Sequence, residues 1–245
     1  MGNQTDCIVL NMVSKFYGNK QVLRDITLSV PYGTIYGLLG PSGCGKTTTV
    51  KIMAGIMEAT SGETYVLGEK MPQLSLMNQI GYMAQSDALY SVLTAAENLE
   101  FFASIYGMKR DQTKKRISEV MELVNLSDDL NKPIAAYSGG MKRRLSLAMA
   151  ILHHPKVLIL DEPTVGIDPL LRKDIWAELY KMSEQGVTIL VTTHVMDEAE
   201  KCQQLAMLRR GRLIASGTPL ELQQRIDAKS IEEAFIYYGG GSIED

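Results

Sequence analysis

A glycine-rich segment in the first quarter of the chain has residues suited to phosphate binding. It fits the pattern G-x-x-x-x-G-K-[ST] at every position, follows the apolar run 35–39 and opens a segment, 47–53, that can be helical. In such a loop backbone N–H groups surround the phosphates, the lysine neutralises the terminal ones, and the threonine hydroxyl binds Mg²⁺. The residues predicted to bind phosphate or Mg²⁺ are Gly40, Pro41, Ser42, Gly43, Cys44, Gly45, Lys46, Thr47 and Thr48.

Two adjacent carboxylates follow a second apolar run. The run 157–160 has no polar residue, as expected of a strand buried on both faces of a parallel sheet. Asp161 would therefore emerge at the carboxyl end of a strand, where open α/β sheets bind ligands, and could bind Mg²⁺ or its waters. Glu162 could orient and deprotonate an attacking water. The structural alternative is that both carboxylates only cap a turn before Pro163.

A third motif, Ser138-Gly139-Gly140, has the features of a helix start. Ser138 stands where an N-cap belongs, and the glycines leave the positive N-terminus of the helix bare, so that it can face an anion. The structural alternative is an ordinary serine-capped helix whose basic residues 142–144 form a solvated face. Apolar residues at helical spacing follow, namely Leu145, Ala148, Met149 and Leu152.

These motifs, in this order, resemble those of the nucleotide-binding subunit of an ABC transporter, over about 6–222. The resemblance implies that Tyr17 stacks on adenine and that Gln85 is the lid glutamine, which senses Mg²⁺ and phosphate. It also implies that the D-loop contains the nucleotide-binding Asp168 and that His194 is the switch histidine. The catalytic residues that it implies are Lys46, Gln85, Glu162 and His194, and the implied metal ligands are Thr47, Gln85 and Asp161.

Each of the single residues also has a structural interpretation. Tyr17 could be a strand aromatic at a turn, Gln85 a polar residue after a strand, and His194 the cap of a helix that starts near Val195. However, His194 follows the run 187–193, a further predicted strand that points to the same sheet edge. A histidine at that edge can hydrogen-bond the terminal phosphate and the water, as the resemblance implies.

The motif positions predict one α/β domain over 1–225 with the fold of a P-loop NTPase. Its core, about 1–85 and 156–222, is expected to hold a mostly parallel sheet flanked by helices and a small antiparallel β layer. A helical subdomain, about 86–155, is inserted between them. The remainder, 226–245, is predicted to be a C-terminal extension with a flexible glycine-rich tail.

Local patterns place some of these elements. The antiparallel layer is predicted from early strands near Leu10, Thr27 and Tyr65. In the inserted subdomain, a capping-box pattern starts one helix at Thr94, and 112–126 has apolar residues at helical spacing.

Composition agrees with a soluble motor rather than a pore. A chain of 245 residues that is 45% hydrophobic can bury one good-sized core. No apolar run approaches the roughly 20 residues that span a bilayer, so direct membrane insertion is not expected. The resemblance then implies a separate integral membrane permease and a cytoplasmic location at the inner face of the membrane. A net charge of -3 gives no reason to expect nucleic acid as a partner.

The three cysteines, Cys7, Cys44 and Cys202, lie far apart and are expected to be reduced thiols. Cys44 differs because it lies in the phosphate loop, near a helix N-terminus and Lys46. These neighbours predict a lowered thiol pKa and a reactive cysteine.

The resemblance also implies a dimer of ATP-binding subunits. Each ATP, with Mg²⁺, would lie between the phosphate loop of one copy and Ser138-Gly139-Gly140 of the other. Tyr137 and Met141 depart from the usual Leu-Ser-Gly-Gly-Gln signature and resemble the exporter branch, which drives drug, antibiotic or lipid efflux. Asp168-Pro169 and the ending 230–236 are similar to that branch as well.

Three other functions stay open at this point. ABC-type ATPases that act on DNA or ribosomes carry long coiled coils or two cassettes, whereas fewer than one hundred residues without sustained heptads separate Gly40 from Ser138. A non-hydrolysing regulatory module would be expected to replace Glu162 or His194. The ATPase of an importer also remains, because the permease decides direction.

Apolar residues between Gln85 and Ser138 are too many for one buried stripe of a helix. We predict that some of them line a groove that receives a short cytoplasmic helix of the permease. The alternative is that all of them pack against the following helix. The residues concerned are Leu89, Tyr90, Val92, Leu93, Leu99, Phe102, Ala103, Ile105 and Tyr106.

Overall fold

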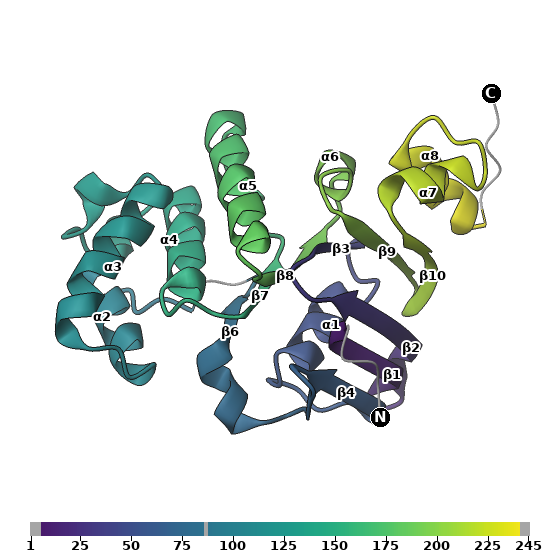
Figure 1. Ribbon diagram of the computed structural model, residues 1–245, viewed down its shortest axis with the longest axis horizontal. Helices are drawn as coiled ribbons and strands as arrows, with labels where there is room; N and C mark the ends of the chain where they lie inside the picture. Colours follow the sequence, from purple (N-terminus) through teal and green to yellow (C-terminus); the bar gives the residue numbers. More distant parts are fainter. Residues whose placement is uncertain (1–5, 86–87, 241–245) are drawn as a thin grey trace. The chain divides into compact units, whose positions relative to one another are not determined.

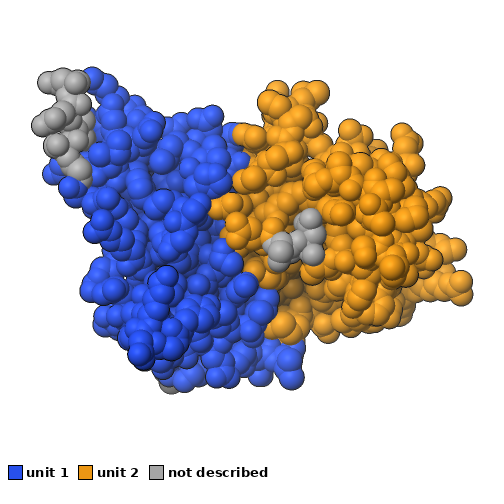
Figure 2. Space-filling model, turned by 180° about the vertical axis from the view of Figure 1, so that it is seen from behind, with its two compact units in different colours: residues 1–74, 188–245 blue, residues 75–187 orange. Residues whose placement is uncertain are grey.

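The computed structural model describes residues 6–85 and 88–240 and divides into two compact units. Unit 1 contains Met1–Leu74 and Thr188–Asp245, and unit 2 contains Ser75–Val187 (Figure 1 and Figure 2). The sequence predicted division at other positions, near 85 and 155. The strands 80–83 and 157–161, which flank the predicted insertion, belong to the same unit as its helices. They pair with each other, and the helix 139–151 of the insertion packs on them.

An antiparallel sheet forms the first part of unit 1. β1 (Asp6–Tyr17) pairs with β2 (Lys20–Pro31) on one side and β4 (Ser61–Val66) on the other, and β5 (Glu69–Lys70) pairs with β4. Residues 26–30 of β2 alternate between buried and exposed, as expected of a strand with one covered face. This sheet confirms the predicted antiparallel layer.

The second group of strands in unit 1 is mostly parallel. β3 (Ile35–Leu39) lies between β8 (Thr188–Thr193) and β9 (Gln204–Arg209) and runs parallel to both. β10 (Arg212–Gly217) joins the edge and is antiparallel to β9. Every residue of β3 and β8 is buried, as in strands covered on both faces. The predicted parallel strands before the phosphate loop and before His194 are therefore confirmed.

The described residues of unit 1 also form four helices. They are α1 (Lys46–Met53), α6 (Met196–Ala199), α7 (Pro219–Gln224) and α8 (Ile231–Tyr238). Helices α6, α7 and α8 share a fully buried cluster with the parallel strands. Its members are Leu39, Ala199, Leu205, Met207, Leu222, Ile231 and Ala234.

The described part of the predicted C-terminal extension is ordered. Ser230 caps α8 by accepting a hydrogen bond from Glu233 N at 3.1 Å, and two residues of the helix lie in the core of unit 1. The predicted flexible tail falls largely on 241–245, outside the described residues.

Unit 2 combines a pair of parallel strands with helices. β6 (Ile80–Met83) pairs with β7 (Val157–Asp161), and α4 (Gly139–Ile151) packs on β6. A Cβ atom on Gly81 would overlap Ala150 O, so glycine is needed for this close approach. The remaining elements are η1 (Leu74–Gln79), α2 (Ala95–Ile105), α3 (Arg110–Leu123), η2 (Ser127–Asp129), η3 (Ile134–Ala136) and α5 (Pro169–Glu184).

The predicted helices of unit 2 are present. Thr94 and Glu97 form the capping box at the start of α2: Thr94 N donates to Glu97 Oε2 at 2.7 Å, and Glu97 N donates to Thr94 Oγ1 at 3.2 Å. Periodicity predicted a helix over 112–126. Helix α3 begins two residues earlier, at Arg110, and ends three residues earlier, at Leu123.

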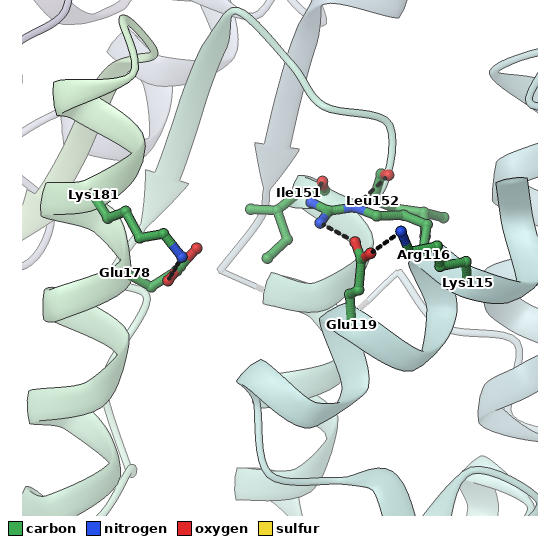
Figure 3. Close-up of polar contacts among 7 residues, drawn as sticks. All are labelled: Lys115, Arg116, Glu119, Ile151, Leu152, Glu178 and Lys181. Carbon is green, nitrogen blue, oxygen red and sulfur yellow. Dashed lines mark hydrogen bonds and ion pairs between the residues drawn. The ribbon is translucent and has the colours of Figure 1, made fainter.

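Arg116 of α3 binds the carboxyl end of α4 (Figure 3). Arg116 donates to Ile151 O at 2.8 Å and to Leu152 O at 3.1 Å, and it pairs with Glu119 at 3.1 Å. These carbonyls belong to the last turn of α4, where no intrahelical donor remains, so Arg116 acts as a side-chain cap. The exposed pair Glu178–Lys181 on α5, also in Figure 3, is expected to contribute little to stability.

Candidate functional site

The predicted phosphate loop joins β3 to α1, as its motif requires. Gly43 and Gly45 have φ values of 76° and 116°, in the left-handed region that glycine adopts at little cost. A Cβ atom on Gly45 would lie 2.6 Å from Leu23 Cδ2, so a larger residue does not fit there without displacement. Because α1 begins directly after Gly45, the N–H groups of its first turn, which have no intrahelical acceptor, adjoin the loop.

Hydrogen bonds hold the loop in shape from within unit 1. The buried Lys46, the first residue of α1, donates from Nζ to Gly40 O, at the start of the loop, at 2.7 Å. Gly40 N donates to Thr193 O at 3.2 Å, and Gly211 N donates to Cys44 O at 2.9 Å. The loop is thus fixed to β8 and to the turn between β9 and β10, which preorganises it for an anion.

His194 lies beside the start of the phosphate loop. It directly follows β8, which is the parallel neighbour of β3, so both segments leave the sheet at the same edge. Both segments line one cavity of about 290 Å³. The residues that line it are Leu39, Gly40, Pro41, Ser42, His194, Met196 and Phe235. Phe235 of α8 is a lining residue that the sequence did not single out for this site.

Tyr17, Thr47 and Thr48 also lie in unit 1. Tyr17 ends β1 with an exposed ring, whose hydroxyl donates to Met57 Sδ at 3.1 Å while Lys15 Nζ lies 5.6 Å from the ring centroid. An exposed ring held at its edge keeps a face on which a base can stack. Thr47 and Thr48 follow Lys46 in the first turn of α1 and are partly buried.

The two predicted carboxylates lie at the end of β7 in unit 2. Asp161 is the last residue of the strand and is fully buried. Glu162 follows it, is 9% exposed, and has a φ of 53°. A left-handed conformation is uncommon for a residue other than glycine and occurs mainly where the surroundings hold it, often at functional sites. The sequence did not reveal this conformation.

Gln85 and Glu162 leave adjacent strands at matching positions. Met83 of β6 is the register partner of Leu160 of β7, so each of the two polar residues lies two positions beyond that pair. Gln85 is exposed. The parallel pairing therefore brings the segments of the predicted lid glutamine and the predicted general base to one edge of unit 2.

The Ser138-Gly139-Gly140 motif starts α4 as predicted. Ser138 Oγ accepts a hydrogen bond from the N–H three residues later at 3.2 Å, and no atom lies within 4 Å of a Cβ placed on Gly139. A Cβ on Gly140 would lie 3.4 Å from Gly166 O, so this helix start adjoins the loop that contains Asp168. Asp168 caps α5, with its Oδ1 3.0 Å from the N–H three residues later.

Arg143 is a residue of this region that the sequence did not assign to the site. Arg143 is 8% exposed, and its guanidinium donates to Ala84 O at 2.8 Å and Gln85 O at 2.9 Å. It also donates to Asp161 O and, at 2.5 Å, to Glu162 O. Arg143 thus joins the two strand ends that carry Gln85 and Glu162. Its position four residues before Leu147 and eight before Ile151, in line with the apolar face of α4, is the sequence signal that could have identified it.

Residues 142–144 do not form the solvated basic face that was the structural alternative for this motif. Besides the buried Arg143, Arg144 is partly buried and donates to Val124 O at 3.0 Å and Asn125 O at 2.8 Å, which caps the end of α3. Two of the three basic residues therefore bind backbone carbonyls.

Burial affects two further groups near these motifs. The pKa of Tyr82 on β6 is raised to about 12, by burial and then by the negative charge of Asp161, so its phenol stays neutral. Cys44 is only 4% exposed, and a Cβ on Gly40 would lie 2.6 Å from its Sγ. This burial counts against the high reactivity predicted for Cys44, because a reactive thiol must be accessible.

The described residues have donors suited to a nucleotide with Mg²⁺. The left-handed glycine loop and the start of α1 offer backbone N–H groups and the Lys46 ammonium to phosphates. Across the described ranges, no cluster of three or more His, Cys, Asp or Glu could hold a metal ion by itself.

Comparison with known proteins agrees with these features. The ABC transporter family matches residues 23–165. The probable multidrug ABC transporter ATP-binding protein YbhF of Escherichia coli (strain K12) is 41% identical over 231 residues, which are 91% of this chain and 40% of YbhF. The linearmycin resistance ATP-binding protein LnrL of Bacillus subtilis (strain 168) is 39% identical over 224 residues, which are 89% of this chain and 71% of LnrL. The chain thus spans less than half the length of YbhF.

Solved structures show the same fold. An ATP-binding subunit of an ABC transporter matches with a TM-score of 0.88 at 28% identity, covering 95% of this chain and 99% of that one. The dimeric post-hydrolysis state of the ATP-binding cassette MJ0796, bound to ADP and Pi, matches with a TM-score of 0.81 at 27% identity, covering 86% and 98%. With its phosphate loop, its α4 start and its β7 carboxylates in the order of that family, the chain belongs to the ABC transporter family as an ATP-binding cassette.

Proposed function

We propose that this chain is the ATP-hydrolysing motor of an exporter that moves a small molecule or lipid through a separate membrane permease. The observation that carries the proposal is the phosphate loop, with its left-handed glycines and its buried lysine, in a chain of the ABC transporter family. The names of YbhF and LnrL, a probable multidrug transporter component and a linearmycin resistance protein, support export rather than action on DNA or ribosomes.

Phosphate binding is assigned to unit 1. Residues Gly40 to Thr48 bind the phosphates through backbone N–H groups and the Lys46 ammonium, and the exposed ring of Tyr17 stacks on adenine. His194, which shares a cavity with the start of the loop, hydrogen-bonds the terminal phosphate.

The hydrolytic groups are assigned to unit 2. Glu162 is the general base that takes a proton from the attacking water, and its left-handed backbone sets the direction in which the carboxylate leaves the strand. Asp161 and Gln85 would bind Mg²⁺, which would supply charge neutralisation at the phosphates. Gln85 is exposed, so its side chain can change conformation when Mg²⁺ or phosphate binds.

A second copy of the cassette completes each site. Ser138 and Gly139 are exposed at the N-terminus of α4, where N–H groups without an intrahelical acceptor and the helix dipole favour an anion. They are proposed to bind the nucleotide held by the partner, together with Asp168. The dimeric MJ0796 structure, bound to ADP and Pi, supports this arrangement. Loss of the terminal phosphate would then reopen the dimer.

The permease is proposed to dock on unit 2. Of the residues predicted to line a groove, Tyr90, Val92 and Ile105 are exposed, whereas Leu99 and Ala103 are fully buried. Phe102 is partly buried, and its neighbour Phe101, which was not predicted, is exposed. Not all of these apolar residues pack inside the unit, which supports the predicted groove. Among the described residues, none of the helices is long and apolar enough to span a membrane. The docked cassette is proposed to lie at the cytoplasmic face.

The test is Glu162→Gln, which keeps the shape of the side chain and removes the base. Steady-state ATP hydrolysis should fall by about 100-fold or more, since general-base catalysis contributes roughly 10²- to 10⁴-fold. ATP should still bind, and size-exclusion chromatography with MgATP should show a stable dimer. Near-normal hydrolysis by this variant, with only monomer in ATP, would disprove the proposed function.

A further inference from the structure

We infer that Arg143 is a positioning residue for hydrolysis, which holds the backbones of Gln85 and Glu162 so that the Glu162 carboxylate meets the attacking water. The inference rests on the proposed function, in which Glu162 is the general base. It concerns contacts that lie wholly within unit 2.

The contacts of Arg143 converge on two segments. One terminal nitrogen, Nη1, donates to Ala84 O at 2.8 Å and Gln85 O at 2.9 Å. The other, Nη2, donates to Asp161 O and to Glu162 O, the latter at 2.5 Å. One side chain therefore binds two successive carbonyls after β6 and two successive carbonyls at the end of β7.

The carbonyls bound on β7 lie on either side of the Glu162 Cα atom. Because Asp161 O precedes this Cα and Glu162 O follows it, the two hydrogen bonds restrain both backbone torsions of Glu162. Its φ of 53° is in a region that residues other than glycine occupy only when their surroundings hold them. Arg143 supplies part of that restraint, so its loss should let the Glu162 carboxylate move away from the productive position.

The chemistry of arginine suits this task. The guanidinium stays protonated and presents its donors in a rigid planar fork, whereas a lysine has one nitrogen on a flexible stem. A charge that is only 8% exposed is costly to bury unless it is well hydrogen-bonded. A buried arginine whose two terminal nitrogens reach four carbonyls can fix the spacing between the segments in a way that a point charge cannot.

Two other arginines of unit 2 each bind two carbonyls at the end of a helix. Arg144, the next residue, binds Val124 O and Asn125 O at the end of α3. Arg116 binds Ile151 O and Leu152 O at the end of α4 (Figure 3). Neither contacts a residue assigned to hydrolysis. Arg144 therefore provides a matched control with the same side chain on the same helix.

The experiment compares Arg143→Lys with Arg144→Lys in the full chain. Arg143→Lys keeps the charge but cannot span four carbonyls. We expect kcat for ATP hydrolysis to fall about 10- to 100-fold, as for a catalytic group displaced by roughly 1 Å, while KM for ATP and the melting temperature change little. Arg144→Lys should keep kcat within about twofold of the unmodified chain, whatever its effect on melting.

A double-mutant cycle separates positioning from a general structural role. In the Glu162→Gln background, residual hydrolysis is followed over long single-turnover times. If Arg143 acts through Glu162, adding Arg143→Lys to this background should change the residual rate less than about twofold, because residues that act as a unit are not additive. A full 10- to 100-fold loss in the Glu162→Gln background, or unchanged kcat in Arg143→Lys alone, would overturn the inference.

Two further outcomes are also decisive. If Arg143→Lys does not fold, Arg143→Gln, which keeps a donor without the buried charge, takes its place. Failure of both to fold, judged by ATP binding and melting, would mean a structural role and would overturn the inference. If Glu162→Gln alone hydrolyses ATP normally, the proposed function is wrong. If Glu162→Gln is inactive but Arg143→Lys keeps a normal kcat, only the inference about Arg143 is wrong.

Discussion

Gly140 lies directly against Gly166: a Cβ atom on the first would be 3.4 Å from the carbonyl oxygen of the second. The start of α4 and the loop before α5 are therefore in close contact within unit 2. Gly139, the next residue toward the N-terminus, faces open space, because no atom lies within 4 Å of the position that a Cβ would take there. The two glycines thus differ in what they meet within the chain, and Gly139 is the better probe of a partner subunit.

We predict that Gly139→Asp abolishes ATP-dependent dimerisation and leaves the fold intact. An aspartate in the first turn of α4 is favourable for the helix, by about 0.3 to 1 kcal/mol, and meets no neighbouring atom. Its negative charge would, however, oppose the phosphates of a nucleotide held by a partner. Chromatography of the Glu162→Gln variant with and without this change, in MgATP, is the measurement. Gly139→Ala should still dimerise, and a dimer with aspartate would place the partner contact elsewhere.

The phosphate loop gives a second prediction. Gly45→Ala forces a φ of 116° on a residue with a Cβ and places that atom 2.6 Å from Leu23 Cδ2. The loop must then change shape, so affinity for ATP should fall by about 100-fold or more, as expected when preorganisation is lost. Gly68→Ala, with a φ of 82° and no atom within 4 Å, tests strain alone and should lose stability without losing ATP affinity. Binding is measured by titration with a fluorescent ATP analogue, and equal affinities for both variants would refute the proposed loop role.

His153 gives a prediction on pH. Its ring stacks on Tyr106 with centroids 3.7 Å apart, and burial, followed by the charges of His154 and Arg116, lowers its pKa to about 4, although its hydrogen bond with Ile80 O opposes the shift. Between pH 6.5 and 4 the unfolded chain therefore binds more protons than the folded one. The stabilisation is complete above pH 6.5 and is lost as the pH falls toward 4.

The size of this effect is of order 2 kcal/mol once partial exposure is allowed for. His153→Phe keeps the stack with Tyr106 but does not titrate, so it serves as the control. Urea unfolding of both proteins at pH 7 and pH 4.5 measures the difference. The unmodified chain should lose more stability than His153→Phe on acidification, and parallel losses would contradict the predicted role of His153.

The backbone features that were predicted correctly depend on local sequence. The glycines of the phosphate loop, the Ser138 cap and the Thr94 capping box each determine the backbone within a few residues, and all three form. The parallel strands before the loop and before Asp161 also follow from short apolar runs. Family resemblance added the single residues that a local pattern cannot assign, such as Gln85 and His194.

The parts that were not predicted depend on partners distant in sequence. Arg143 binds carbonyls that lie 58 and 59 residues earlier and 18 and 19 residues later. Any residue offers a backbone carbonyl, so the acceptors leave no mark in the sequence. The left-handed Glu162 is likewise set by surrounding contacts rather than by its type. Phe235 reaches the cavity near His194 only because α8 packs against the sheet.

The final prediction concerns the surface proposed to receive the permease. Asn98, fully buried on α2, accepts from Tyr90 N at 2.9 Å and donates to Tyr90 O at 3.1 Å, so the backbone at Tyr90 is fixed independently of its ring. Tyr90 is 48% exposed, and its ring meets that of Phe101 edge-on with the centroids 5.1 Å apart. Tyr90→Asp should therefore leave melting and ATP hydrolysis unchanged but remove apolar surface and add a charge where a partner helix would bury it.

Co-purification with the co-expressed permease, and transport, should both be lost in Tyr90→Asp. Leu220→Asp, at a residue of α7 that is 61% exposed, introduces the same charge in unit 1 and should preserve both. Tyr90→Phe, which keeps the ring, should also preserve both. Because Asn98 fixes the backbone in every one of these proteins, a loss confined to Tyr90→Asp would reflect the missing ring contact and the new charge. Equal co-purification of all variants would mean that the permease docks on another surface.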